Sequence, residues 1–127
     1  MSAIGFAIVS YDEPDQLRRL ARTLDAVYEH PPIVCHHDFS QCPMETQEVE
    51  PFVHFVRPHV ETGWGIVATV AAAVSALSTL QELHDPDWMF LLSGSCYPVK
   101  PADVVRQVLG ALPFDALLVI GRSHRAN

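Results

Sequence analysis

The chain has 127 residues, 49% of them hydrophobic and 18% charged, so it can bury the core of one domain and is not a disordered segment. Its 15 acidic residues against 8 Lys and Arg give a net charge of −7. That balance argues against a nucleic-acid surface, which needs a basic face to meet phosphates. It leaves room for a single nucleotide, which needs only a few well-placed groups.

Targeting segments and disulfides are not expected. The opening residues lack the basic stretch that precedes the apolar run of a signal peptide. The longest weakly polar run, residues 66–80, is too short for a membrane span, which takes about 20 residues. Cys35, Cys42 and Cys96 show no CxxC spacing and indicate reduced thiols, neither a disulfide frame nor a zinc site. We expect a cytoplasmic protein, free or peripheral at a membrane.

The first half of the chain predicts a strand, a helix and two further strands. Residues 3–10 are a short apolar run typical of a strand buried on both faces. Pro14 and its acidic neighbours suit a helix start. Residues 33–37 and 52–56 are the second and third predicted strands. The apolar face of the helix repeats at helical spacing: Leu17, Leu20, Ala21, Leu24 and Val27.

The second half predicts helices alternating with strands. Residues 66–83 keep helical spacing and are weakly polar throughout, so this helix should be mostly buried. Residues 88–92 form a fourth buried strand, 101–112 a third helix and 115–121 a fifth strand. The alternation predicts one α/β domain, with a mostly parallel, Rossmann-like sheet and helices on both faces.

The carboxyl ends of the strands are where such sheets bind ligands. Asp38 follows the second strand, where its carboxylate could accept a hydrogen bond from a ribose hydroxyl or from N3–H of uracil. The sequence equally allows a turn-forming residue that bonds its own backbone. His36 and His37 point to opposite faces of a strand, so we expect one inward and one outward histidine and no shared metal ion.

Two glycine-containing turns complete the candidate ligand edge. The first, Gly63-Trp64-Gly65, precedes a helix whose N-terminus favours an anion such as pyrophosphate, and an indole can stack on a base or sugar. A core tryptophan is the alternative. The second turn, residues 93–98 (SGSCYP), follows the fourth strand. Cys96 in it is better interpreted as structural than as a nucleophile, because nothing indicates a lowered pKa.

Taken in order, these segments resemble the core-2/I-branching glycosyltransferase family, which includes the peptide-O-xylosyltransferases. The resemblance spans about residues 4–121. Residues 12–20 (DEPDQLRRL) are similar to the family's first helix, and residues 36–40 (HHDFS) to its H-x-D-x-K segment. Residues 64–66 (WGI) match its W-G-G turn, and residues 90–100 (FLLSGSCYPVK) match F-x-L-L-S-G-x-D-Y-P-[IVL]-K.

The resemblance implies a GT-A-like fold and a UDP-sugar donor. It implies an inverting transfer of a hexosyl, N-acetylglucosaminyl or pentosyl group to an acceptor hydroxyl, with no metal and no other cofactor. By the same resemblance Asp38 would hold the uracil or ribose, and Val9 and Ser10 would contact the base through their backbone. The remaining donor-site residues would line the pocket and its floor: Trp64, Gly65, Ser93, Gly94 and Tyr97.

Three positions depart from the family patterns: Ser40 replaces a basic residue, Ile66 a glycine and Cys96 an aspartate. The chain is also about half as long as a family domain. We therefore expect it to be the N-terminal, donor-binding portion, with the general base and the acceptor site outside residues 1–127. Glu61 is expected to be only a solvated loop residue. The edge where the missing portion would dock predicts self-association.

Two other interpretations remain open from the sequence. One is a degenerate module that keeps the fold without transfer activity, favoured by Cys96 and Ser40. The other is an unrelated doubly wound binding domain. The lack of a glycine-rich phosphate loop after the first strand weighs against a nucleotide-binding domain of the Rossmann dinucleotide or P-loop kind.

Overall fold

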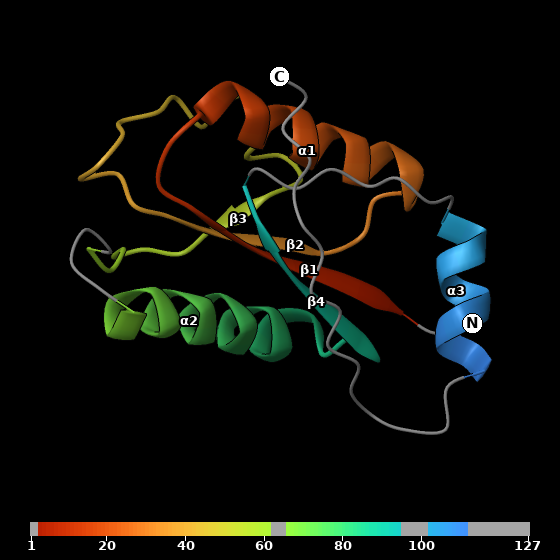
Figure 1. Cartoon of the computed structure of the whole chain (residues 1–127). Helices are drawn as coiled ribbons and strands as arrows, with labels where there is room; N and C mark the ends of the chain where they lie inside the picture. Colours follow the sequence, from red (N-terminus) through yellow and green to blue (C-terminus); the bar gives the residue numbers. More distant parts are fainter. Residues whose placement is uncertain (1–2, 62–65, 95–101, 112–127) are drawn as a thin grey trace, which may run out of the picture.

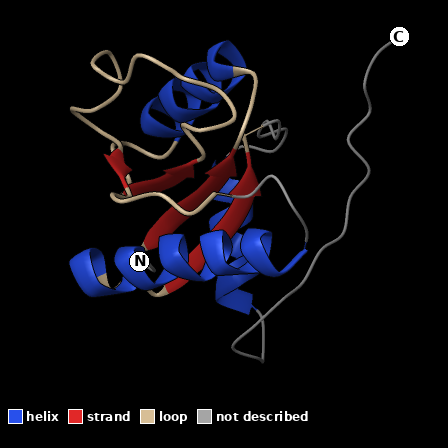
Figure 2. Cartoon of the chain, turned by 90° about the vertical axis from the view of Figure 1, so that its left-hand side faces the viewer, coloured by secondary structure: helices blue, strands red, loops and turns tan. Residues whose placement is uncertain are grey.

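The computed structural model describes residues 3–61, 66–94 and 102–111. A parallel sheet of four strands forms its centre, in the order β3-β2-β1-β4. Helices α1 and α2 cover opposite faces of this sheet (Figures 1 and 2). The α/β class is therefore confirmed. The elements are β1 (Ile4–Ser10), α1 (Pro14–Val27), β2 (Ile33–His37), β3 (His54–Phe55), α2 (Ile66–His84), β4 (Trp88–Ser93) and α3 (Ala102–Ala111).

Helix α1 forms where the apolar spacing predicts it. Pro14 occupies the first turn, where no N–H is needed, and Asp15 suits the positive end of the helix dipole. Its apolar face packs on the sheet in the main core, where Phe6 and Ile8 of β1 are buried. One prediction for this helix was wrong. Val27 is 40% exposed, and the next residue, Tyr28, is buried in its place.

Helix α2 covers the other face, but it is not mostly buried as its composition suggests. Ala72, Ala76 and Leu80 form its one fully buried edge, which packs on Ala7 and Val34 of the two central strands. The alanines are small enough to bring the helix close to the sheet. The opposite side of the helix carries a stripe of exposed valines: Val67 at 85%, Val70 at 53% and Val74 at 55%.

Strand β3 is shorter than predicted. The amides of Phe52 and Val53 both donate to the carbonyl oxygen of Val49, at 3.0 and 2.8 Å. This turn uses the N–H groups that a longer strand would have offered to the sheet, and only two residues remain to pair with β2. The sequence period alone could not show this competition.

Strand β4 is partly buried on one face and exposed on the other, where the sequence predicted a fully buried strand. Trp88, Phe90 and Leu92 pack against the main core, whereas Met89 and Leu91 are 39% and 50% exposed. Among the described strands, β4 lies at an edge of the sheet, and α2 packs mainly over β1 and β2. The predicted fifth strand, residues 115–121, lies outside the described residues.

Helix α3 agrees closely with its prediction and packs through Leu109 on the α1 side of the sheet. Val104 and Val108, predicted to share its packed face, are 40% and 50% exposed. In the part of the chain that the structure describes, no helix has both the length and the apolar character needed to cross a membrane.

Candidate functional site

The sheet has a topological switch point between β1 and β4. From β1 the chain passes through α1 to β2, on one side of β1. From β3 it returns through α2, on the other face, to β4 on the opposite side of β1. Because the two crossovers diverge, a crevice is expected beyond the carboxyl ends of β1 and β4. In open α/β sheets this is where ligands bind.

Four of the predicted donor-site residues meet at this switch point. Val9 and Ser93 are paired across the two strands, and the N–H of Gly94 donates to the Val9 carbonyl at 2.9 Å. A β-carbon on Gly94 would lie 3.0 Å from both Cβ and Oγ of Ser10. A side chain at residue 94 would therefore press on Ser10, and one of the two strand ends would have to shift slightly. Ser10 and Gly94 are buried, and Ser93 is exposed.

Asp38 joins the same edge from β2. Its N–H donates to the carbonyl oxygen of Ser10 at 2.9 Å. The backbone carbonyls of Val9 and Ser10 thus each accept one internal hydrogen bond. A carbonyl oxygen has two lone pairs, so each retains capacity for a second donor such as uracil N3–H.

The Asp38 carboxylate is fully buried and shapes its own loop. Oδ1 accepts hydrogen bonds from the N–H of Ser40, at 3.0 Å, and from the Ser40 hydroxyl. Oδ2 accepts one from the Gln41 side chain at 2.9 Å, and His59 Nε2 lies 3.6 Å from Oδ1. The bond from residue 40 is an Asx turn, so the turn-forming role that the sequence left open is present. A ribose hydroxyl could reach this carboxylate only by replacing one of these partners.

His37 is buried beneath this edge and links β1 to the loop after β2. Its Nε2 lies 2.6 Å from the carbonyl oxygen of Cys42, so this nitrogen carries a proton and donates it. Its Nδ1 lies 3.0 Å from the Ser10 hydroxyl. Burial lowers the pKa of His37 from 6.5, although the Cys42 carbonyl partly offsets that effect. In the neutral ring, Ser10 donates to Nδ1.

His36 points to the other face and makes a different contact. The N–H of Val60 donates to its Nε2 at 2.8 Å. Burial lowers the pKa of His36, and the neighbouring His59 and His37 act in the same direction. The two histidines do point to opposite faces. The expectation of one outward ring was wrong, because helices or loops cover both faces and both rings are fully buried.

An aromatic and basic cluster flanks the loop, and sequence reasoning missed it. The ring of Phe39 lies 4.8 Å from His37 and 5.6 Å from His59, both edge to face. The Arg57 guanidinium lies 5.2 Å from the Phe39 ring centre. These residues are up to 22 positions apart, and only the chain reversal after β3 brings them together. Arg57 places a cation at this edge of an acidic chain.

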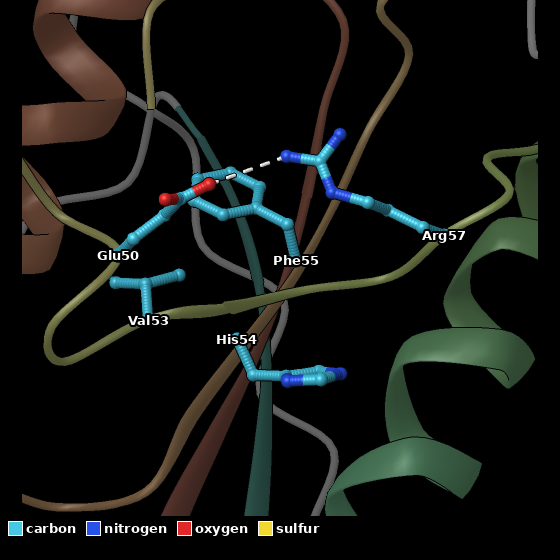
Figure 3. Close-up of a pocket in the computed structure, with 5 residues that line it drawn as sticks. All are labelled: Glu50, Val53, His54, Phe55 and Arg57. Carbon is cyan, nitrogen blue, oxygen red and sulfur yellow. Dashed lines mark hydrogen bonds and ion pairs between the residues drawn. The ribbon is translucent and has the colours of Figure 1, made fainter. Parts of the chain in front are cut away.

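A small pocket lies outside β3, two strands from the switch point (Figure 3). Its volume is about 380 Å³. An ion pair of 3.4 Å between Arg57 and Glu50 crosses it, and the hydroxyl of Thr46 donates to the same Glu50 oxygen at 2.6 Å. The pocket is lined by Glu50, Val53, His54, Phe55 and Arg57. Its charged groups already satisfy one another.

Most of the other predicted site residues are not in the part of the chain that the structure describes. Trp64, Gly65, Tyr97 and Cys96 lie outside the described residues. Glu61 is exposed, as expected for a solvated loop residue.

Comparison of the chain with protein-family models, with curated proteins and with solved structures finds no match. The function has to be argued from the switch point and from the motifs around it.

Proposed function

We propose that this chain supplies the donor-binding portion of a UDP-sugar-dependent glycosyltransferase. The observation that carries the proposal is the close approach of Ser10 and Gly94 at the topological switch point. A crevice floored by small residues lets a ligand meet the strand backbone, and this backbone retains acceptor capacity at Val9 and Ser10. The four sequence motifs of the resemblance, in family order, support the same ligand.

The transfer would be an in-line displacement at the anomeric carbon. An acceptor hydroxyl attacks that carbon, a carboxylate base takes the hydroxyl proton, and UDP leaves. The base and the acceptor site belong outside residues 1–127 in this proposal. The described residues would orient the nucleotide. Arg57 pairs with Glu50 beside β3, so the basic groups that offset the diphosphate charge without a metal would also lie outside residues 1–127.

Asp38 has an indirect role in this proposal. Its carboxylate holds the loop of residues 38–42 beside the crevice through Ser40 and Gln41. Direct contact with the ribose would follow only if the nucleotide displaced the Ser40 hydroxyl. Asp38→Ala should therefore weaken nucleotide binding by loosening this loop.

A non-catalytic nucleotide-binding module is the second candidate, and one observation favours it. Ser40 stands where the family pattern has a basic residue, and its hydroxyl and amide both bond to Asp38. The position therefore serves the loop and adds no charge for a donor phosphate. The chain would be joined to its downstream sequence and mixed with UDP-N-acetylglucosamine or UDP-xylose. Binding of UDP without any release of UDP from these donors would support this module.

Titration calorimetry with UDP in EDTA tests the proposal. We expect saturable one-site binding that weakens at least tenfold in Gly94→Ala, because the added methyl group pushes on Ser10. Gly110→Ala is the matched control, since nothing lies within 4 Å of its β-carbon position. Absence of binding at millimolar UDP in a folded wild-type chain would contradict the proposal. Equal affinity for UDP and ADP would favour the unrelated binding domain.

A further inference from the structure

The hydrogen bond between Val60 and His36 fixes which nitrogen of the ring carries the proton. A backbone amide can only donate, so Nε2 of His36, 2.8 Å from the Val60 nitrogen, must be unprotonated. The neutral ring then carries its hydrogen on Nδ1. That atom is buried and has no hydrogen-bond partner outside its own residue, an arrangement that is unfavourable for a buried donor.

A second proton on His36 has only one place to go. It must add to Nε2, where it would face the Val60 N–H donor to donor. His37 differs in this respect. Its Nε2 already donates to the Cys42 carbonyl, and its Nδ1 faces the Ser10 hydroxyl, which can accept from the ring and donate to the Asp12 carbonyl 3.3 Å away. His37 can be protonated with its hydrogen bonds kept, and His36 cannot.

From this contrast we propose that His36 is an acid-sensitive latch, which holds residues 57–61 against the end of β2 only while its ring is neutral. This inference is independent of the proposed function. It assigns a conformational role to a buried histidine that the nucleotide site does not use.

The groups around His36 determine the direction of the switch. His59 lies on the held segment, and Asp38 and His37 lie at the end of the same strand. Neither β1 nor the stretch of α2 from Val67 to Gln81 contains a titratable side chain. A charged His36 would be a buried cation beside His59. Burial already lowers the pKa of His36, so the latch is closed at neutral pH and opens on acidification.

Residues 57–61 also make contacts other than the Val60 hydrogen bond. These contacts are either weaker than that bond or hold a different residue. Arg57 packs over Phe39 and pairs with Glu50, but its side chain is 58% exposed, and exposed ion pairs contribute little. His59 Nε2 lies 3.6 Å from Oδ1 of Asp38. This contact lies at residue 59 and does not replace the hydrogen bond of Val60. The Val56 N–H donates to the Cys35 carbonyl at 2.9 Å, a bond that does not titrate.

Amide hydrogen exchange measured by NMR on the intact chain, from about pH 7.5 to about pH 5, tests the latch. After correction for intrinsic exchange, protection of the Val60 amide relative to that of Val56 should fall as His36 titrates. The protection ratio of Val60 to Val56 can fall by at most about tenfold per pH unit. In His36→Gln the side-chain oxygen can still accept from Val60, so the ratio should stay constant. His37→Gln is the matched control and should keep the wild-type fall.

Two outcomes would overturn the proposal. One is a Val60 to Val56 ratio that does not change with pH in the wild type. The other is the same fall in His36→Gln as in the wild type. Should His36→Gln fail to fold, the ring nitrogen shifts of wild-type His36 decide the question. They must change over the same pH range as Val60 protection, and a change over a different range contradicts the latch.

Discussion

A β-carbon placed on Gly94 would lie 3.0 Å from both Cβ and Oγ of Ser10, so a side chain at residue 94 would press the end of β4 against the end of β1. Gly94→Ala should lower the free energy of unfolding by about 1–3 kcal/mol, the usual cost of overpacking. Gly110→Ala, in the last turn of α3 with open space around it, should raise it by no more than about 0.5–1 kcal/mol. Urea denaturation measures both.

A double-mutant cycle identifies the atom responsible. Ser10→Ala removes Oγ and leaves Cβ, so the cost of Gly94→Ala should be smaller in the Ser10→Ala background. Strictly additive effects of the two substitutions would show that Oγ is not the cause and would leave Cβ of Ser10 as the atom responsible.

The two adjacent buried histidines should be opposite tautomers. His36 accepts from Val60 at Nε2 and carries its proton on Nδ1, whereas His37 donates from Nε2 to Cys42. Two-bond ¹H–¹⁵N correlation spectra at neutral pH distinguish the two forms. Finding Nε2–H on both rings would contradict the Val60 bond, and finding Nδ1–H on both would contradict the Cys42 bond.

The stability of the fold should fall as the pH is lowered. Burial lowers the pKa of both His36 and His37 from the ordinary 6.5. Below about pH 6.5 the unfolded chain therefore binds more protons than the folded one, and the free energy of unfolding decreases by up to about 1.4 kcal/mol per pH unit for each group. Above that pH the contribution of these groups is constant.

Substitutions of the two buried histidines show whether these side chains cause the pH dependence of stability. His36→Gln and His37→Gln should each flatten the curve of unfolding free energy against pH between about pH 6.5 and 5. Gly110→Ala is the control, because it changes no titratable group and should leave the shape of the curve unchanged. A curve unaltered by either buried substitution would show that these rings do not cause the effect.

The sequence predicted the fold class and most element positions, because these depend on local periodicity. The apolar runs of β1 and β2 and the face of α1 are visible in the sequence itself. The burial of α2 was not predictable, because its composition does not say how many elements cover it. Val70 and Val74 would be equally suited to a buried or an exposed side of this helix.

The candidate site was predictable only as positions along the strands. The rule for parallel sheets placed Ser10, Asp38 and Gly94 at one edge. Whether Asp38 faces a ligand or its own loop depends on Ser40 and Gln41, whose bonds the sequence does not show. The contacts of His37 with Ser10 and of His36 with Val60 join residues 27 and 24 positions apart, and no motif indicated them.

The exposed valines of α2 should promote self-association. Val67, Val70 and Val74 lie on the outward side of a helix without a charged residue from Val67 to Gln81. Val70→Glu should shift the chain toward monomer in size-exclusion chromatography at increasing concentration. Gln81→Glu adds the same charge to an exposed position on the same helix and should have little effect. A wild-type chain that stays monomeric at all concentrations would contradict this prediction.

The central claim, a nucleotide site at the switch point, is tested most directly by mapping UDP onto the folded chain. ¹H–¹⁵N spectra would be recorded during titration with UDP in EDTA. The account predicts saturable shifts concentrated at the amides of Ser10, Tyr11, Asp38, Ser93 and Gly94, with β3 and the C-terminal half of α2 unaffected. No shifts at millimolar UDP, or shifts confined to the pocket beside β3, would contradict it.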